Sequence, residues 1–258
     1  MKYDYIECGD NVTLMKKLPE ECIDLTVTSP PYDNLRTYKG FSWDFEGVAK
    51  ELFRITKKGG VVVWIVADAT INGSETGTSF KQALFFKEIG FNLHDTMIWE
   101  KPAFTATGSL AVRYASVFEY MFVLSKGKLK TFNPIKDRKN KTSGYKKTGS
   151  IRQIDGSFRP KSSLGKEIPE YGQRFNVWHI APEMSNKKRC GHPAQFPEQL
   201  ANDHIISWSN EGDVVFDPFL GSGTTAKMAV LNNRHYIGFE LAEEYFDIAC
   251  KRLDDVET

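Results

Sequence analysis

Apolar residues in this chain come in short runs that alternate with amphipathic stretches, a pattern typical of α/β proteins. Residues 61–66 form a continuous apolar run, as expected of a strand buried in a parallel sheet. Residues 43–56 instead read as an amphipathic helix that ends at Lys57-Lys58-Gly59-Gly60. The same criteria predict strands over 23–27, 95–99, 117–124, 214–216 and 235–239, and helices over 11–18, 79–89 and 224–231. This alternation predicts a doubly wound sheet in which 95–99 and 117–124 lie close to a hairpin arrangement.

The strand predicted at 23–27 runs through Thr28 into the tetrapeptide Ser29-Pro30-Pro31-Tyr32. Each proline fixes its own φ and restricts the residue before it, so the strand is expected to deliver a rigid loop. This loop would hold a hydroxyl, a backbone carbonyl and an aromatic ring in a fixed relation to one another. Taken alone, the four residues also fit an ordinary turn.

A second motif follows the apolar strand at 214–216 and reads Asp217-Pro218-Phe219-Leu220-Gly221-Ser222-Gly223-Thr224-Thr225. Its glycines allow a ligand to approach the backbone closely, and the helix that follows offers free N–H groups. The next strand ends at Glu240, and an acid at that place suits hydrogen bonds to ribose hydroxyls. A phosphate-binding dinucleotide loop is the competing interpretation, but the third glycine of that fingerprint is missing. The combination predicts a nucleoside-cofactor site.

The formal net charge of +1 hides an uneven distribution of charge along the chain. Residues 126–189 contain 17 Lys and Arg against 5 Asp and Glu, a local balance of +12, whereas the remainder carries −11. Aromatic residues are interspersed in the same segment, which suits a phosphate backbone and unstacked bases. A solvated loop with incidental charge is the alternative.

Four scattered cysteines without C-x-x-C spacing favour free thiols in a reducing compartment. Cys190 with His192 would be half of a metal site, but no second pair supports it, so no metal is expected. The sequence shows neither a secretory signal nor a long uncharged apolar stretch, and a cytoplasmic protein with no membrane contact is expected.

Both motifs resemble those of the amino-methylating DNA methyltransferases, the N4-cytosine and N6-adenine enzymes. Ser29 to Tyr32 matches the catalytic S/D/N-P-P-Y/F/W motif, and Asp217 to Gly223 matches the D-P-F-x-G-x-G cofactor loop. The catalytic motif comes first and the cofactor loop last, as in the β-class of that family. Ile6 to Asp10 is similar to the opening G-D segment, and Gly191 to Pro197 to the K/H-P-x-x-x-P segment before the cofactor strand.

The resemblance implies a Rossmann-like methyltransferase fold with a mostly parallel, seven-stranded sheet that includes one antiparallel hairpin strand. Residues 1–125 would form its catalytic part, 126–189 an inserted basic target-recognition segment, and 190–258 the cofactor-binding part of the same domain. Both sites would lie at the carboxyl ends of the strands, where both motifs fall.

The resemblance also implies S-adenosylmethionine as cofactor and double-stranded DNA with a flipped base as substrate. Ser29 Oγ and the Pro30 carbonyl would accept the amine hydrogens, with Pro31 stiffening the loop and Tyr32 stacked on the base. Glu240 would hold the ribose and Asp10 the adenine or its neighbourhood, although helix capping is a structural alternative for residues of these types. The remaining cofactor-binding residues would be Asp217, Pro218, Phe219, Gly221, Ser222, Gly223 and Thr224, with Thr225 equally able to serve structure alone.

Serine in the first motif position resembles the N4-cytosine enzymes, whereas adenine enzymes more often carry Asp or Asn; N6-adenine therefore stays the alternative. A nicotinamide dehydrogenase would leave Ser29 to Tyr32 and the basic segment unexplained. Intact motifs argue against a catalytically silent DNA-binding protein, and the lack of a Pro-Cys pair argues against C5-cytosine methylation. Asp33, Arg36, Tyr38 and Asp68 are weaker candidates near the catalytic loop. The sequence leaves open a homodimer and a cognate restriction endonuclease.

Overall fold

The computed structural model describes residues 2–32, 43–102, 110–182 and 195–257. Two compact units emerge: the larger comprises Met1–Asn133 with Asn176–Thr258, and the smaller comprises Pro134–Phe175. The predictions made for Asp33, Arg36, Tyr38, for Cys190 with His192, and for the segment 191–194 lie outside the described residues.

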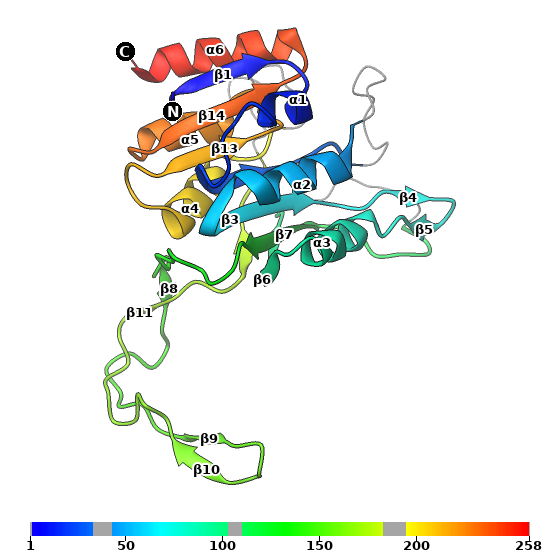
Figure 1. Cartoon of the computed structure of the whole chain (residues 1–258). Helices are drawn as coiled ribbons and strands as arrows, with labels where there is room; N and C mark the ends of the chain where they lie inside the picture. The colour runs from blue at the N-terminus through cyan, green and yellow to red at the C-terminus, as the bar shows by residue number, and fades with distance from the viewer. Residues whose placement is uncertain (1, 33–42, 103–109, 183–194, 258) are drawn as a thin grey trace. The chain divides into compact units, whose positions relative to one another are not determined.

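A twisted sheet forms the centre of the larger unit (Figure 1). Among the described residues it has eight strands, and β7 alone runs antiparallel to its neighbours. Their order across the sheet is β1 (Tyr5–Cys8), β14 (His235–Glu240), β13 (Val214–Asp217), β2 (Ile23–Thr28), β3 (Thr56–Val66), β7 (Phe118–Ser125), β6 (Asn92–Glu100) and β12 (Val177–His179). The prediction of a mostly parallel, doubly wound sheet is confirmed.

The predicted count of seven strands is wrong by one, because β12 adds a short parallel strand beside β6. This strand lies within the segment 126–189 that was expected to be inserted, so the separate unit is shorter than that segment. Strand β3 also begins at Thr56, five residues before the apolar run, because Thr56 pairs with Ile23 across an irregularity in register. Gly60 permits this course, since a Cβ there would lie 2.9 Å from the Asp24 carbonyl oxygen.

Six helices in the described residues cover the two faces of the sheet. Successive strand residues point to opposite faces, and β3 shows the result: Val61, Val63 and Ile65 join one core, and Val62, Trp64 and Val66 join the other. The first core includes α4 (Glu198–Trp208), α5 (Thr224–Leu231) and α6 (Glu243–Glu257), and the second includes α1 (Asn11–Met15), α2 (Phe45–Ile55) and α3 (Thr78–Glu88). This three-layer arrangement leaves the strand ends uncovered by helix faces, which is where a site can form.

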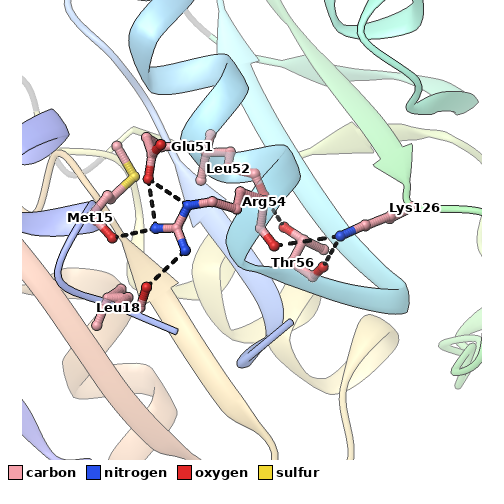
Figure 2. A network of polar contacts seen from close by, with 7 residues as sticks. All are labelled: Met15, Leu18, Glu51, Leu52, Arg54, Thr56 and Lys126. Carbon is pink, nitrogen blue, oxygen red and sulfur yellow. Dashed lines mark hydrogen bonds and ion pairs between the residues drawn. The ribbon is translucent and has the colours of Figure 1, made fainter. Parts of the chain in front are cut away.

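Arg54, near the end of α2, ties that helix to the turn after α1 (Figure 2). Its guanidinium donates to the carbonyl oxygens of Met15 and Leu18, both at 2.8 Å, and to the Glu51 carboxylate. Lys126, in the same view, donates to the Thr56 carbonyl at 2.9 Å. These bonds satisfy carbonyl groups that the ends of α1 and α2 leave without intrahelical partners.

The smaller unit consists of two short antiparallel pairs and the loops that join them. Strand β8 (Arg138–Lys139) pairs with β11 (Tyr171–Gly172), and β9 (Ser150–Arg152) pairs with β10 (Phe158–Pro160). No residue of this unit is buried, and several large apolar side chains are exposed, among them Tyr145, Ile154, Phe158 and Phe175. Within the described residues, none of the helices combines the length and apolar character needed to cross a membrane.

Candidate active site

The two sequence motifs meet through a side-chain hydrogen bond. Strands β2 and β13 are parallel neighbours, with Leu25 beside Val215 and Thr26 beside Phe216. At their carboxyl ends Thr28 Oγ1 donates to Asp217 Oδ1 at 2.6 Å, although the two residues are 189 positions apart. The loop that begins at Ser29 and the loop that begins at Pro218 therefore leave the sheet side by side.

Asp217 is a buried acid with an unusual charge state. Only 1% of the residue is exposed, and Oδ1 accepts both from Thr28 and from the backbone N–H of Phe219 at 3.0 Å. Among the described residues, Oδ2 is buried and has no hydrogen-bond partner. Burial raises the pKa of Asp217 to about 7, against the opposing effect of the Thr28 and Phe219 hydrogen bonds. The carboxyl group can therefore change its charge near neutral pH.

Glu240 ends β14 and spans the glycine loop and the next turn. Its Oε2 accepts from the backbone N–H of Gly221 at 2.8 Å, and its Oε1 accepts from that of Ala242 at 2.9 Å. Burial raises the pKa of Glu240, while these backbone hydrogen bonds act in the opposite direction. Each carboxylate oxygen keeps a second lone pair, so the group can still accept from hydroxyl groups of a ligand.

Asp10 lies at the same edge of the sheet, after β1. It is exposed, and its Oδ1 caps α1 by accepting from the Thr13 N–H at 2.8 Å. Gly9 N donates to the Glu240 carbonyl at 2.8 Å, and Asn11 Nδ2 donates to the Pro218 carbonyl at 3.1 Å. The ends of β1, β13 and β14 thus bring Asp10, Asp217 and Glu240 to one edge.

The hydroxyls of Ser222 and Thr224 point to a structural partner that the sequence did not reveal. Arg252 on α6 donates to Ser222 Oγ at 2.9 Å, to the Ser222 carbonyl at 2.7 Å and to Thr224 Oγ1 at 3.1 Å. Its other terminal nitrogen contacts Glu198 at 2.7 Å. Thr225 Oγ1 donates to the Val27 carbonyl at 3.1 Å and so binds α5 to β2. All three hydroxyls therefore help to hold the loop in shape.

In the rest of the glycine loop, Pro218 is buried and the Phe219 ring is half-buried, packed edge-on against Trp43 at 5.0 Å. Gly221 and Gly223 have φ of 54° and 80°, in the left-handed region where glycine is favoured.

The loop Ser29–Tyr32, expected to be catalytic, contains a second series of hydrogen bonds. Ser29 Oγ lies 2.8 Å from the Tyr32 hydroxyl, which donates to Glu119 Oε2 at 2.6 Å. Glu119 is only 8% exposed and forms an ion pair with Lys101. Pro30 is buried and Pro31 half-buried. Glu119 was not predicted from the sequence, although an acid near the start of the otherwise apolar strand β7 was a usable signal.

Asp68 takes part neither in the hydrogen bonds of Asp217 nor in those that link Ser29, Tyr32 and Glu119. It accepts from the Ser79 backbone N–H at 2.9 Å and from Thr76 Oγ1 at 3.2 Å, and so serves the start of α3. In the described part of the chain, no group of three or more His, Cys, Asp or Glu side chains is placed to hold a metal ion.

A Rossmann-like sheet with a glycine loop, an acid at the end of the neighbouring strand and a Ser-Pro-Pro-Tyr loop is the arrangement expected of a methyltransferase that uses a nucleoside cofactor. The N6/N4 methyltransferase family model, described as DNA methylase, matches residues 23–251. The orphan methyltransferase M.BamHII of Bacillus amyloliquefaciens is 57% identical over 93% of this chain and 92% of its own length. The chain therefore belongs to the amino-methylating DNA methyltransferase family, as the sequence motifs predicted.

Solved structures agree with this fold. The cytosine-N4-specific PvuII DNA methyltransferase superimposes with a TM-score of 0.72 at 22% identity, over 98% of this chain and 86% of that one. The M1.HpyAVI complex with S-adenosylmethionine gives 0.66 at 24% identity, over 96% and 98% of the two chains.

Proposed function

We propose that the protein transfers a methyl group from S-adenosylmethionine to N4 of a cytosine in double-stranded DNA. Cytosine is favoured because serine, Ser29, occupies the first position of the catalytic motif. Its hydroxyl is hydrogen-bonded to that of Tyr32. N6-adenine is the second candidate, because the matched family model covers both amines.

The acids at the sheet edge fit the cofactor by their chemistry. Glu240 keeps lone pairs for the two ribose hydroxyls, and the buried, unpartnered Oδ2 of Asp217 suits a ligand that carries positive charge. The loop from Asp217 to Gly223 would hold the methionyl end, and Asp10 the adenine end. Because Ser222 and Thr224 already bind Arg252, their contribution would come from the backbone. S-adenosylmethionine supplies an electrophilic methyl group on a sulfonium.

The residues of the catalytic loop would act on the acceptor amine. Its lone pair is conjugated with the base, so the amine must become pyramidal before it attacks. Ser29 Oγ and the Pro30 carbonyl favour that geometry by accepting its two hydrogens, and Tyr32 offers a ring face to the flipped base. Flipping is part of the proposal because a stacked, paired base cannot enter such a loop.

The smaller unit, Pro134–Phe175, is proposed as the core of the target-recognition region. It contains 11 Lys and Arg against 4 Asp and Glu, together with exposed aromatic side chains. Basic and aromatic groups on extended hairpins suit contact with phosphates and with unstacked bases. The proposed reaction requires neither a homodimer nor a companion endonuclease.

The test is to incubate the protein with DNA and methyl-labelled cofactor, and then to digest the DNA completely to nucleosides. Label in N4-methyldeoxycytidine supports the proposal, and label in N6-methyldeoxyadenosine supports the second candidate. Ser29→Ala and Tyr32→Ala serve as matched inactive controls. If the protein is folded and binds the cofactor but no label enters the DNA, both candidate functions are overturned.

A further inference from the structure

Four polar side chains from three segments form one continuous hydrogen-bond chain beside the catalytic loop. The chain runs from Lys101 to Glu119, then to the Tyr32 hydroxyl and then to Ser29 Oγ. Glu119 and Lys101 come from β7 and from the residue after β6, two neighbouring antiparallel strands. Lys101 also lies 4.7 Å from the centre of the Trp99 ring, which fixes its position further.

The donors and acceptors in this hydrogen-bond chain allow only one arrangement of the hydroxyl hydrogens. The Lys101 ammonium can only donate, and a carboxylate paired with it can only accept. The single hydroxyl hydrogen of Tyr32 is donated to Glu119 Oε2. The contact between Ser29 and Tyr32 must therefore use the hydrogen of Ser29, with the phenolic oxygen as acceptor. Ser29 Oγ is left with lone pairs and without a hydrogen to offer to a ligand.

We propose that Glu119 is a positioning residue that makes Ser29 a hydrogen-bond acceptor and that receives the proton released by the methylated amine. This inference rests on the proposed function. In the step, the N–CH3 bond forms as the S–CH3 bond breaks, and the electron pair of the broken bond stays on sulfur. The amine proton passes to Ser29 Oγ, the Ser29 hydrogen to the Tyr32 oxygen, and the Tyr32 hydrogen to the Glu119 carboxylate.

The donor-to-acceptor direction of these hydrogen bonds also determines which bases the Ser29–Tyr32 loop accepts. An exocyclic amine offers hydrogens to Ser29, whereas the carbonyl at the same place in uracil offers only lone pairs. Two acceptors facing each other leave a desolvated polar group unpaired, which is costly. The hydrogen-bond chain therefore selects a base with an exocyclic amine over one with a carbonyl at the same place. By the same argument, adenine would be preferred to hypoxanthine.

Glu119→Gln is the informative substitution because it keeps the shape of the side chain and reverses the direction of the hydrogen bonds through Tyr32 and Ser29. Lys101 still requires an acceptor, so the amide oxygen turns to Lys101 and the amide NH2 donates to the Tyr32 oxygen. Tyr32 then donates to Ser29, and the Ser29 hydrogen turns toward the base. Tyr32→Phe keeps the ring and interrupts the chain. Glu100→Gln, on the adjacent strand and paired with His179 at 3.2 Å, is a matched control outside the chain.

The first measurement is the single-turnover rate of methyl transfer at saturating cofactor and DNA. Glu119→Gln and Tyr32→Phe are each expected to slow it about 100-fold, within the usual range for a proton-transfer group, with cofactor affinity unchanged. The double variant is expected to be no slower than either single variant, and Glu100→Gln to match wild type. Additive losses in the double variant would overturn the proposal, because Glu119 would then act independently of Tyr32.

The second measurement is the affinity for DNA that carries uracil in place of the cytosine that wild type methylates. Wild type is expected to bind the uracil duplex at least tenfold more weakly, and Glu119→Gln to lose this preference. An equal preference in both proteins would overturn the inference. If wild type methylates no amine, the proposed function fails instead. If Glu119→Gln does not fold, the Tyr32→Phe rate decides alone, and an unchanged rate refutes the relay.

Discussion

Thr28 donates a 2.6 Å hydrogen bond to Asp217 and thereby joins the strand that leads to the Ser29–Tyr32 loop to the strand that leads to the glycine loop. The bond favours the charged form of the acid: burial raises the pKa of Asp217, the Thr28 hydrogen bond lowers it, and the net result is a pKa of about 7. The geometry of the two loops and the charge of Asp217 are therefore linked.

Thr28→Val is expected to destabilise the protein by about 1–3 kcal/mol, because it removes a donor from a buried acceptor at nearly constant shape. The loss should be larger at pH 8 than at pH 5.5, since the charged form of Asp217 needs the hydrogen bond more than the neutral form. Urea unfolding at the two pH values measures the difference. Thr26→Val is the matched control, because Thr26 Oγ1 is buried on the same strand without a hydrogen-bond partner among the described residues. An equal loss in both variants would contradict the role of Asp217.

Asp217→Asn is expected to remove a pH dependence from stability. The pKa of Asp217 is about 7 in the folded protein and near 3.8 in the unfolded chain, so the folded protein retains a proton between these values that the unfolded chain has lost. The free energy of unfolding of wild type therefore falls as pH rises from about 4 to 7. Each pKa unit corresponds to about 1.4 kcal/mol, so the total fall in stability over this pH range amounts to several kcal/mol.

The Asn variant should lack this slope and be more stable than wild type at pH 8, while it binds S-adenosylmethionine more weakly. Unfolding at several pH values and cofactor titration check the two effects. A variant that shows the wild-type slope would assign the pH dependence to another group, with Glu240 as the next candidate because its pKa is also raised.

Much of this arrangement could be predicted from local sequence. The strand at 23–28 with its proline loop and the strand, glycine loop and helix from 214 to 231 lie where patterning and turn residues placed them. The capping role of Asp10 was also predictable, since it depends on Thr13, three residues away. In each case neighbours in sequence supply the interaction, so the pattern carries the information.

The contacts that could not be predicted join residues far apart in the chain. Glu119 reaches Tyr32 across 87 positions, and Arg252 reaches Ser222 across 30. Hydroxyls beside glycines look alike in sequence whether they face a ligand or a neighbouring helix. Strand β12 was missed because three residues with one buried side chain give too short a pattern within a basic segment.

Arg252→Met is expected to weaken cofactor binding about tenfold and to lower stability by about 2–4 kcal/mol. Arg252 holds the Ser222 carbonyl and two loop hydroxyls, and only 13% of its side chain is exposed, so its loss leaves buried acceptors unpaired. Isothermal titration with S-adenosylmethionine and thermal unfolding measure the two effects. Lys251→Met, at an exposed position next to it, controls for the loss of positive charge on α6. Normal cofactor affinity in Arg252→Met would show that the loop keeps its shape without this clamp.

Arg54→Met is expected to lower stability by about 2–3 kcal/mol without a change in methyl transfer at temperatures where the variant is folded. The substitution leaves the Leu18 carbonyl and the half-buried Glu51 without the guanidinium donor, and leaves the Met15 carbonyl with the Leu18 N–H alone. Lys50→Met is the control, because the exposed pair of Lys50 with Glu46 is worth less than about 0.5 kcal/mol, and its contact with the Phe85 ring, at 5.8 Å from the ring centre, is a long one. Chemical unfolding compares the two variants. A loss as small as that of Lys50→Met would mean that water replaces the guanidinium at no cost.

DNA binding by the smaller unit is expected to depend on salt concentration. Lys141 and Lys146 are exposed in Pro134–Phe175, and a lysine that contacts a phosphate contributes about −0.9 to the slope of log affinity against log salt concentration. Replacement of both by Gln should make this slope shallower by up to about 1.8 and weaken binding to all DNA sequences alike. Fluorescence anisotropy at several salt concentrations measures the slope. Lys81→Gln with Lys87→Gln removes the same charge from α3 and should leave the slope unchanged. If both pairs change the slope equally, net charge rather than the basic unit governs DNA binding.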